Sequence, residues 1–393
     1  MSRFVLRPRV LPLWKPLRQS ARRTLFDIVR RVFATDDGRT IAEQALRGLL
    51  RASAPFTPDD PLRTHQIYAE LGRPRRAPRP RHGDPIFITG RFRSGSTLLW
   101  NIFRQVDGCT AYYEPFNERR WFDPAARGSR VDATHLGVTD YWREYDGLER
   151  LGDYYDERWI DHELYMEADA WNPAMKQYVA ALIAAAPGRA VLQFNRIDFR
   201  LPWFRANFPD ATIVHLFRNP RDQWCSSLVD PRRISKDTDV PAFAAHDYFY
   251  LLAWARDLKH HFPFLDERAV AHPYQLFYYI WKLSYLFGAQ YAHHSIALEH
   301  LLARRERELT ALMRAAGIDR YDLARLAACV VAQPSGKWRD WADNAWFAAH
   351  ESSCETVLED FFGTQSCSID SSGRRTGREP AARVLRRIPG SQA

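Results

Sequence analysis

The stretch "PIFITGRFRSGSTLLWNIF", residues 85–103, decides the fold because it joins a strand signal, a glycine loop and a helix signal. Residues 85–89 are a short apolar run, and residues 96–106 carry apolar side chains at helical spacing. Gly90 and Gly95 have the G-x-x-x-x-G spacing of a phosphate-binding loop. In such a loop, backbone N–H groups and the positive end of the following helix attract an anion. We therefore expect a phosphate site between this strand and this helix.

The loop departs from that of nucleotide-hydrolysing enzymes, which reads G-x-x-x-x-G-K-[ST]. Ser96 stands where the lysine is expected, and Thr97 takes the hydroxyl position. Kinases and ATPases also use an aspartate after a neighbouring strand to hold Mg²⁺. The other strand-like runs end instead in Asn195 (189–195) and, just after 211–217, in Arg218. A magnesium-nucleotide mechanism is not favoured, and a kinase-like enzyme with a degenerate loop remains the alternative.

The order of elements predicts an α/β fold. Strand-like runs alternate with helical stretches, notably residues 174–186, and such alternation is typical of a parallel sheet with helices on its faces. We expect a P-loop-like three-layer sandwich with a central parallel sheet. Residues 241–330 are helix-like and rich in aromatic side chains, with little strand character. They are expected to form a helical layer on the sheet or a lid over its edge.

A second motif, "HLFRNPRDQWCSSL", spans residues 215–228. Arg218 falls at the end of a predicted strand, Asn219 is a favoured N-cap residue, and Pro220 suits the first helical position. Ser226 lies almost two turns into that helix. An arginine at a strand's carboxyl end and a serine on the next helix can grip one phosphate from two sides. Two phosphate grips predict a nucleotide with phosphates at two separate positions.

The charge of the chain is unevenly distributed. Its 393 residues carry a net charge of +9, with the basic residues concentrated in 1–36, 73–82 and 365–393. The remaining body is mildly acidic, whereas a nucleic-acid enzyme is expected to carry basic stripes on its folded surface. No nucleic-acid partner is therefore predicted. We predict a basic helical extension with a Pro/Arg linker (1–83), a folded domain (84–364) and a disordered basic tail (365–393).

Residues 25–33 have the apolar spacing of an amphipathic helix with arginines on its polar face. Two interpretations stay open, a helix docked on the core and a basic helix lying on an anionic membrane surface. No apolar run reaches the roughly 20 residues of a membrane span, and the start of the chain is a poor secretory signal. We expect a cytoplasmic location, with peripheral membrane contact as the second interpretation.

The five cysteines are odd in number, widely spaced and without a C-x-x-C pair. This pattern argues against a disulfide framework and against a zinc site. No metal ligands are predicted.

The motifs resemble those of the sulfotransferases that use 3′-phosphoadenosine 5′-phosphosulfate (PAPS). "GRFRSGSTLL" (90–99) resembles their 5′-phosphosulfate loop, and "RNPRDQWCS" (218–226) resembles their 3′-phosphate motif. "PSGKWRDW" (334–341) and "CETVLEDFFG" (354–363) resemble the C-terminal segment of the carbohydrate-type and bacterial branches. The similarity spans roughly residues 85–363. It implies PAPS as co-substrate, its 3′,5′-bisphosphate as product, and no requirement for a metal.

The resemblance also implies a role for Arg93. A sulfuryl group carries less negative charge than a phosphoryl group, so no metal is needed to screen it. Many family members use a loop lysine at the position where this chain has Arg93, as in the carbohydrate-type branch. An arginine keeps its proton, so Arg93 is expected to stabilise the charge that grows on the leaving 5′-phosphate. The donor of a proton to that leaving group stays unassigned.

The attacking hydroxyl must lose a proton, and Glu114 in "YYEPFN" is the predicted base. It lies 21 residues after Arg93, and a glutamate at about this spacing serves as base in glycan-type relatives. A glutamate merely paired with an arginine of the site is the structural alternative. His135, His162 and His246 are rival bases that no local pattern favours.

The resulting prediction is a sulfotransferase that acts on a hydroxyl of a carbohydrate, glycolipid or related metabolite. A catalytically silent nucleotide-binding protein is a further alternative, and the oligomeric state is not predicted. The residues expected to contact the acceptor are Arg196, Phe116 and Asn117. The residues expected to bind the nucleotide are Gly90, Arg91, Phe92, Arg93, Ser94, Gly95, Ser96, Thr97, Arg218, Ser226, Lys337 and Trp338.

Overall fold

The computed structural model describes residues 83–331 and 336–365. The predicted amphipathic helix at 25–33, the Pro/Arg linker and almost all of the basic tail lie outside the described residues. The boundaries proposed for these parts therefore stay predictions.

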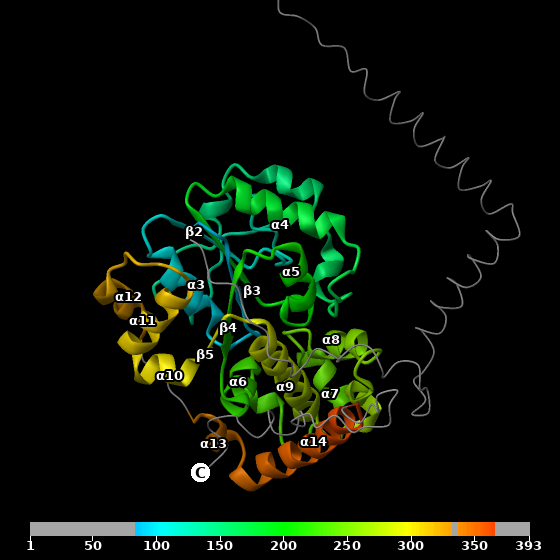
Figure 1. Cartoon of the computed structure of the whole chain (residues 1–393). Helices are drawn as coiled ribbons and strands as arrows, with labels where there is room; N and C mark the ends of the chain where they lie inside the picture. Colours follow the sequence, from blue (N-terminus) through cyan, green and yellow to red (C-terminus); the bar gives the residue numbers. More distant parts are fainter. Residues whose placement is uncertain (1–82, 332–335, 366–393) are drawn as a thin grey trace, which may run out of the picture. The chain divides into compact units, whose positions relative to one another are not determined.

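The described residues contain one five-stranded sheet in the order β2-β3-β1-β4-β5 (Figure 1). All neighbouring strands run parallel, with Ile86 opposite both Val191 and Thr212 in the central pairs. The first strand of the sequence is thus the middle strand of the sheet. The predicted α/β architecture with a central parallel sheet is confirmed. The strands are β1 (Ile86–Thr89), β2 (Cys109–Tyr113), β3 (Arg189–Phe194), β4 (Thr212–Phe217) and β5 (His294–Ala297).

Residues 241–330, expected to be helix-like with little strand character, contain one short strand, β5. His294 pairs with Val214, so this segment closes one edge of the sheet. The strand has four residues, of which only Ile296 is buried. A run this short and this polar lacks the apolar signal by which the other strands are recognised.

Helices cover both faces of the sheet. α3, α11 and α12 lie on one side of the strands, while α5 and α9 lie on the other (Figure 1). The α-helices are α3 (Ser96–Arg104), α4 (Pro173–Ala185), α5 (Leu201–Asn207), α6 (Pro220–Ser227), α7 (Val240–Phe243), α8 (Leu251–Leu258), α9 (Pro273–Tyr291), α10 (Leu298–Ala303), α11 (Arg305–Ala315), α12 (Leu323–Cys329), α13 (Trp338–Trp341) and α14 (Asn344–Gln365). The 3-10 helices are η1 (Arg143–Tyr145), η2 (Glu149–Asp153), η3 (Glu157–Ile160), η4 (Asp198–Arg200), η5 (Pro231–Arg233), η6 (Ala244–His246), η7 (Pro263–Leu265) and η8 (Glu267–Ala269).

Aromatic rings fill the layer between the sheet and α5. Phe87 of the central strand meets Phe194, Phe204 and Phe208 edge to face, at centroid distances of 5.9, 5.5 and 5.5 Å. Edge-to-face pairs add about 0.5–1.5 kcal/mol each beyond the burial of their area. The middle of the sheet is therefore fixed by packing, and the loops at its carboxyl edge start from rigid positions.

Candidate active site

The candidate site lies where the parallel strands end. Glu114 follows β2, Asn195 follows β3, and Arg218 follows β4, while the glycine loop follows β1. Since the carboxyl ends of parallel strands share one edge of the sheet, these residues converge. They line one cavity of about 730 Å³, which is within the usual range for ligand pockets.

Gly95 shapes the loop at the start of α3. Its φ of 96° is left-handed, a conformation that glycine adopts without strain. A Cβ at this position would lie 2.8 Å from Leu298 Cδ1, so the loop also needs glycine for space. No side chain caps the N-terminus of α3, which leaves its first backbone N–H groups available to an anion.

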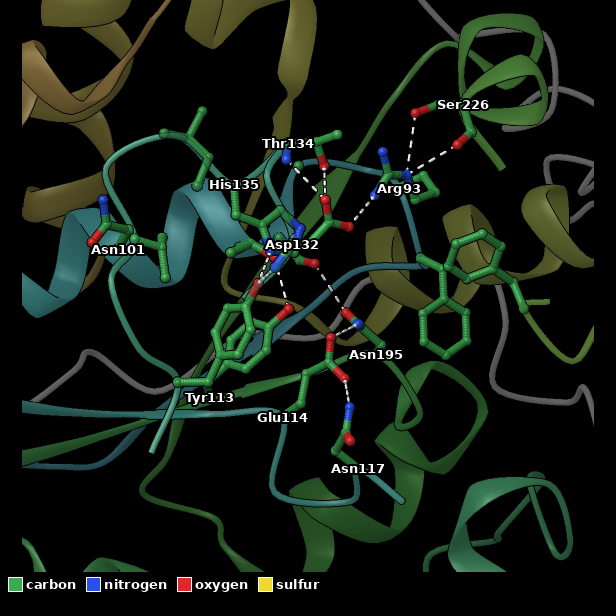
Figure 2. A pocket seen from close by; sticks show the side chains of 18 of the residues that line it. Arg93, Asn101, Tyr113, Glu114, Asn117, Asp132, Thr134, His135, Asn195 and Ser226 are labelled. Atoms are coloured by element: carbon green, nitrogen blue, oxygen red, sulfur yellow. Dashed lines mark hydrogen bonds and ion pairs between the residues drawn. The ribbon is translucent and has the colours of Figure 1, made fainter. Parts of the chain in front are cut away.

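Arg93 connects the loop with two other segments. Its Nε donates to the backbone oxygen of Ser226 at 3.0 Å and to Ser226 Oγ at 3.2 Å (Figure 2). Its Nη1 lies 3.6 Å from Asp132 Oδ2. Arg218 Nη1 donates to the backbone oxygen of Arg93 at 3.2 Å. Arg93 therefore joins the two predicted phosphate sites, the glycine loop and the pair of Arg218 and Ser226.

The second motif forms the helix predicted for it. Asn219 caps α6 by accepting hydrogen bonds from the N–H groups of Arg221 and Asp222, and Pro220 is in its first turn. Arg218 is 8% exposed, and burial lowers the pKa of its guanidinium. The charges of Asp222 and Glu299 oppose this shift.

Glu114 is held from several sides. Asn195 Nδ2 donates to Oε1, and Asn117 Nδ2 donates to Oε2 at 2.5 Å (Figure 2). Arg196 Nη1 lies 3.5 Å from Oε2. Burial raises the pKa of this carboxyl, and the charge of Arg196 opposes the rise. The carboxylate keeps a fixed direction and a raised basicity, as a general base requires.

The backbone at the site is strained. Arg93 and Glu114 have φ values of 65° and 39°, and Tyr250, which also lines the cavity, has 60°. Five non-glycine residues of the described segments have such left-handed φ values, and three of them face this cavity. Strained backbone of this kind collects at functional sites, where the surrounding structure maintains it.

His135 joins the cavity from the loop that follows β2. Its Nε2 lies 3.3 Å from Thr97 Oγ1, and its Nδ1 lies 2.5 Å from the hydroxyl of Tyr141. Thr97 Oγ1 also shares a 2.9 Å hydrogen bond with the hydroxyl of Tyr113. Burial lowers the pKa of His135 to about 4, so the imidazole is neutral at pH 7. Thr97 of the glycine loop thus hydrogen-bonds with Tyr113 and His135.

The other two rival histidines, His162 and His246, do not line the cavity. The predicted site residues that do line it are Phe92, Arg93, Gly95, Ser96, Thr97, Glu114, Asn117, Arg196, Arg218, Ser226 and Lys337.

Five predicted site residues lie outside the cavity lining: Gly90, Arg91, Ser94, Phe116 and Trp338. A Cβ at Gly90 would lie 2.8 Å from the backbone oxygen of Leu216, so its place is structural. Phe116 is in the core, with its ring centroid 5.0 Å from those of Trp159 and Phe194.

Arg91 points away from the cavity although it belongs to the loop. Its guanidinium lies 4.0 Å from the ring centroid of Trp254. Burial lowers the pKa of Arg91 to about 10, opposed by the charge of Asp198. Arg91 therefore anchors the loop on the helical layer, and its predicted contact with a nucleotide stays a prediction.

Several cavity residues were not predicted from the sequence. Asn195 is one, although a polar residue directly after a buried strand is a usable signal in an α/β sheet. The others include Asn101, Tyr113, Asp132, Thr134 and Tyr141, together with the Tyr248–Tyr250 segment, and no local pattern marks them as site residues.

No helix in the described segments is long and apolar enough to cross a membrane. In the same segments, no group of three or more His, Cys, Asp or Glu side chains is placed to hold a metal ion.

A family model described as "Sulfotransferase family" matches residues 85–322. Among solved structures, the chain is similar to a sulfotransferase from Mycobacterium avium, at 13% identity and a TM-score of 0.37, over 73% of this chain and 77% of that one. It is also similar to the sulfotransferase domain of an olefin synthase from Synechococcus, at 16% identity and a TM-score of 0.32, over 73% and 98% of the two chains. A sulfotransferase from Alicyclobacillus acidocaldarius matches at 17% identity and a TM-score of 0.34, over 70% and 94%. No curated protein matches the chain. The structural likenesses are weak, whereas the family match covers more than half of the chain.

Proposed function

Because the chain belongs to the sulfotransferase family, we propose that it transfers a sulfuryl group from PAPS to a hydroxyl of a carbohydrate, glycolipid or related small molecule. The observation that carries this proposal is the meeting of two anion grips at Arg93, on one cavity with Glu114. The family match supports sulfuryl transfer, and the identity of donor and acceptor is our inference.

The residues of the cavity fit a nucleotide with two phosphate positions. One position is offered by the uncapped start of α3 beside Gly95, and the other by Arg218 with Ser226. Lys337 adds a cation from the C-terminal segment to the same lining. PAPS, when bound, supplies the sulfuryl group and a phosphate as leaving group.

The roles of the protein side chains follow from their positions. Glu114 takes the proton of the acceptor hydroxyl while the hydroxyl oxygen forms its bond to sulfur and the bond from sulfur to the phosphate oxygen breaks. Arg93 stabilises the negative charge that grows on this phosphate. Arg196 and Asn117 keep Glu114 in place, so they affect the acceptor through the base.

Thermal unfolding with added nucleotides tests the donor. A ligand at 100 times its Kd adds about 2.7 kcal/mol to the free energy of unfolding. We expect 3′,5′-ADP to raise the Tm without a metal, and 5′-ADP to raise it less at equal concentration. Stabilisation by Mg-ATP with no effect of 3′,5′-ADP would contradict the proposal and favour the kinase-like alternative.

Radiolabelled PAPS tests the acceptor. Transfer of the label to sugars, glycolipids or other hydroxyl compounds in a panel identifies the acceptor class directly. Binding of 3′,5′-ADP without transfer to any hydroxyl compound, and without loss of label from PAPS, would favour the catalytically silent alternative.

A further inference from the structure

The motif at residues 215–228 contains two charged residues that the proposed chemistry does not use, Arg221 and Asp222. Both lie in the first turn of α6, whose other residues hold the glycine loop. Gln223 Nε2 donates to the backbone oxygen of Phe92 at 2.8 Å, and Ser226 accepts from Arg93. Gln223 and Ser226 are three residues apart and so share one face of the helix.

Arg221 holds the C-terminal segment. Its Nε and Nη2 donate to the two carboxylate oxygens of Glu351 on α14 at 2.8 and 2.7 Å. Its Nη1 donates to Asn344 Oδ1 at 2.6 Å. The hydrogen bonds to Glu351 raise the pKa of Arg221, which stays charged. A paired guanidinium fork of this kind fixes direction as well as distance.

The same guanidinium explains where Trp338 lies. It sits 4.8 Å from the ring centroid of Trp338 and 5.3 Å from that of Phe347. Trp338 is thus bound to α6 by a cation–π contact instead of facing the cavity. Lys337, one residue earlier, lines the cavity.

Asp222 holds the same segment from its other side. It is 5% exposed, and its Oδ1 accepts the backbone N–H of Gly336 at 2.8 Å. Gly336 has a φ of 81°, and a Cβ there would lie 2.3 Å from Arg339 Nη1. The residues on both sides of Lys337 are therefore fixed to consecutive residues of α6 (Figure 1 shows α6 beside α13).

We propose that Arg221 and Asp222 are positioning residues that hold Lys337 at the cavity, so that they set nucleotide affinity through Lys337. This inference rests on the proposed function, because it takes Lys337 to contact a phosphate of the nucleotide. α6 then fixes the glycine loop with Gln223 and Ser226 and the C-terminal segment with Arg221 and Asp222. This one short helix therefore sets the distance between Arg93 of the glycine loop and Lys337 of the C-terminal segment.

The test is a double-mutant cycle read by calorimetric titration of 3′,5′-ADP into the full chain. Lys337→Ala is expected to weaken binding by about tenfold, as loss of a charge-assisted hydrogen bond does. Asp222→Ala is expected to weaken binding by about threefold to tenfold in the wild-type background. In the Lys337→Ala background it is expected to have less than about a twofold effect, since coupled residues are not additive.

Two conservative variants sharpen the cycle. Asp222→Asn keeps an oxygen that can accept the Gly336 N–H, and it is expected to bind 3′,5′-ADP within about twofold of wild type. Arg221→Lys keeps the charge but loses the paired hydrogen bonds, and it is expected to weaken binding about as much as Asp222→Ala.

Tyr278→Phe controls for a general loss of stability. The Tyr278 hydroxyl of α9 donates to Glu355 of α14 at 2.5 Å, a contact separate from those that hold Gly336 and Trp338. This variant is expected to lower the Tm while leaving the affinity for 3′,5′-ADP unchanged.

The outcomes that overturn the inference are distinct from failure of the proposed function. Equal loss of affinity from Asp222→Ala in both backgrounds would show that Asp222 does not act through Lys337. Unchanged affinity in Lys337→Ala, while the wild-type chain binds 3′,5′-ADP, would overturn the inference alone. A wild-type chain that does not bind 3′,5′-ADP would overturn the inference together with the proposed function.

Discussion

The two walls of the cavity are built in different ways. The loop wall consists of the lining residues of the glycine loop (Phe92, Arg93, Gly95, Ser96 and Thr97) with Arg218 and Ser226, and it depends on backbone geometry and on spacings within short motifs. The base wall consists of Glu114, Asn117, Asn195 and Arg196, which hydrogen-bond or pair through their side chains.

This difference separates two tasks. Backbone N–H groups and a helix start bind any suitably placed anion and keep their charge at every pH. The base wall instead holds a titratable group whose basicity depends on its neighbours. We therefore expect substitutions on the loop wall to change affinity and charge stabilisation, and substitutions on the base wall to change proton transfer.

The largest effect is expected from Glu114→Gln. Removing a general base costs about 10²–10⁴-fold in kcat, while 3′,5′-ADP should bind as before because the loop wall is untouched. The measurement is kcat with the acceptor identified by label transfer, beside a titration of 3′,5′-ADP. Glu118→Gln is the matched control, since Glu118 also pairs with Arg196, at 2.7 Å, but is exposed. Equal losses in the two variants would remove Glu114 from its role as base.

Arg93→Ala is expected to lower mainly kcat, whereas Arg218→Ala is expected to weaken mainly the binding of 3′,5′-ADP. Loss of Arg93 removes stabilisation of the leaving group, and such a donor is worth about 10²–10³-fold in kcat. Loss of Arg218 removes a phosphate contact and is expected to raise the Kd for 3′,5′-ADP by about tenfold to a hundredfold. Turnover and affinity measured on both variants check this split. The reverse pattern would exchange the two roles.

Arg196→Gln is expected to change the pH profile. The charge of Arg196 lowers the pKa of Glu114, so its removal raises that pKa. Because the base must be ionised, the rise of kcat/KM from acid pH should then occur at higher pH than in wild type. A profile of kcat/KM between pH 4 and 8 measures the shift. A loss of rate by the same factor at every pH would mean that Arg196 does not act through Glu114.

The smallest effect is expected from Asp132→Asn. Asp132 pairs with Arg93 at 3.6 Å, but its side chain is 45% exposed. Exposed ion pairs contribute about 0.2–1 kcal/mol, so kcat should fall less than about fivefold. A fall of a hundredfold would add Asp132 to the base wall.

The sequence predicts the loop wall better than the base wall. The glycine spacing, the Asn219 cap and the Pro220 start are local, so strand, loop and helix follow from neighbouring residues. Glu114 is predicted from its spacing of 21 residues after Arg93 in the sequence. Its bond from Asn195 joins residues 81 positions apart, which no local pattern encodes.

Orientation within a motif is also hidden in the sequence. Arg91 and Arg93 are two residues apart in one loop, yet only Arg93 faces the cavity. The direction of each depends on the helical layer and on α6, which are made much later in the chain. For the same reason Lys337 lines the cavity while Trp338 packs on Arg221.

The contact between Gly95 and Leu298 has a consequence for the order of folding. The glycine loop is made early, but Leu298, which packs against Gly95, follows β5, about 200 residues later. Both edges of β1 pair with strands from residues 189–217, β3 and β4, so neither edge can be paired before those residues are made. Contacts this distant along the chain slow folding. A growing chain that has not yet reached Leu298 thus carries the complete phosphate motif without all of the residues that pack against its loop.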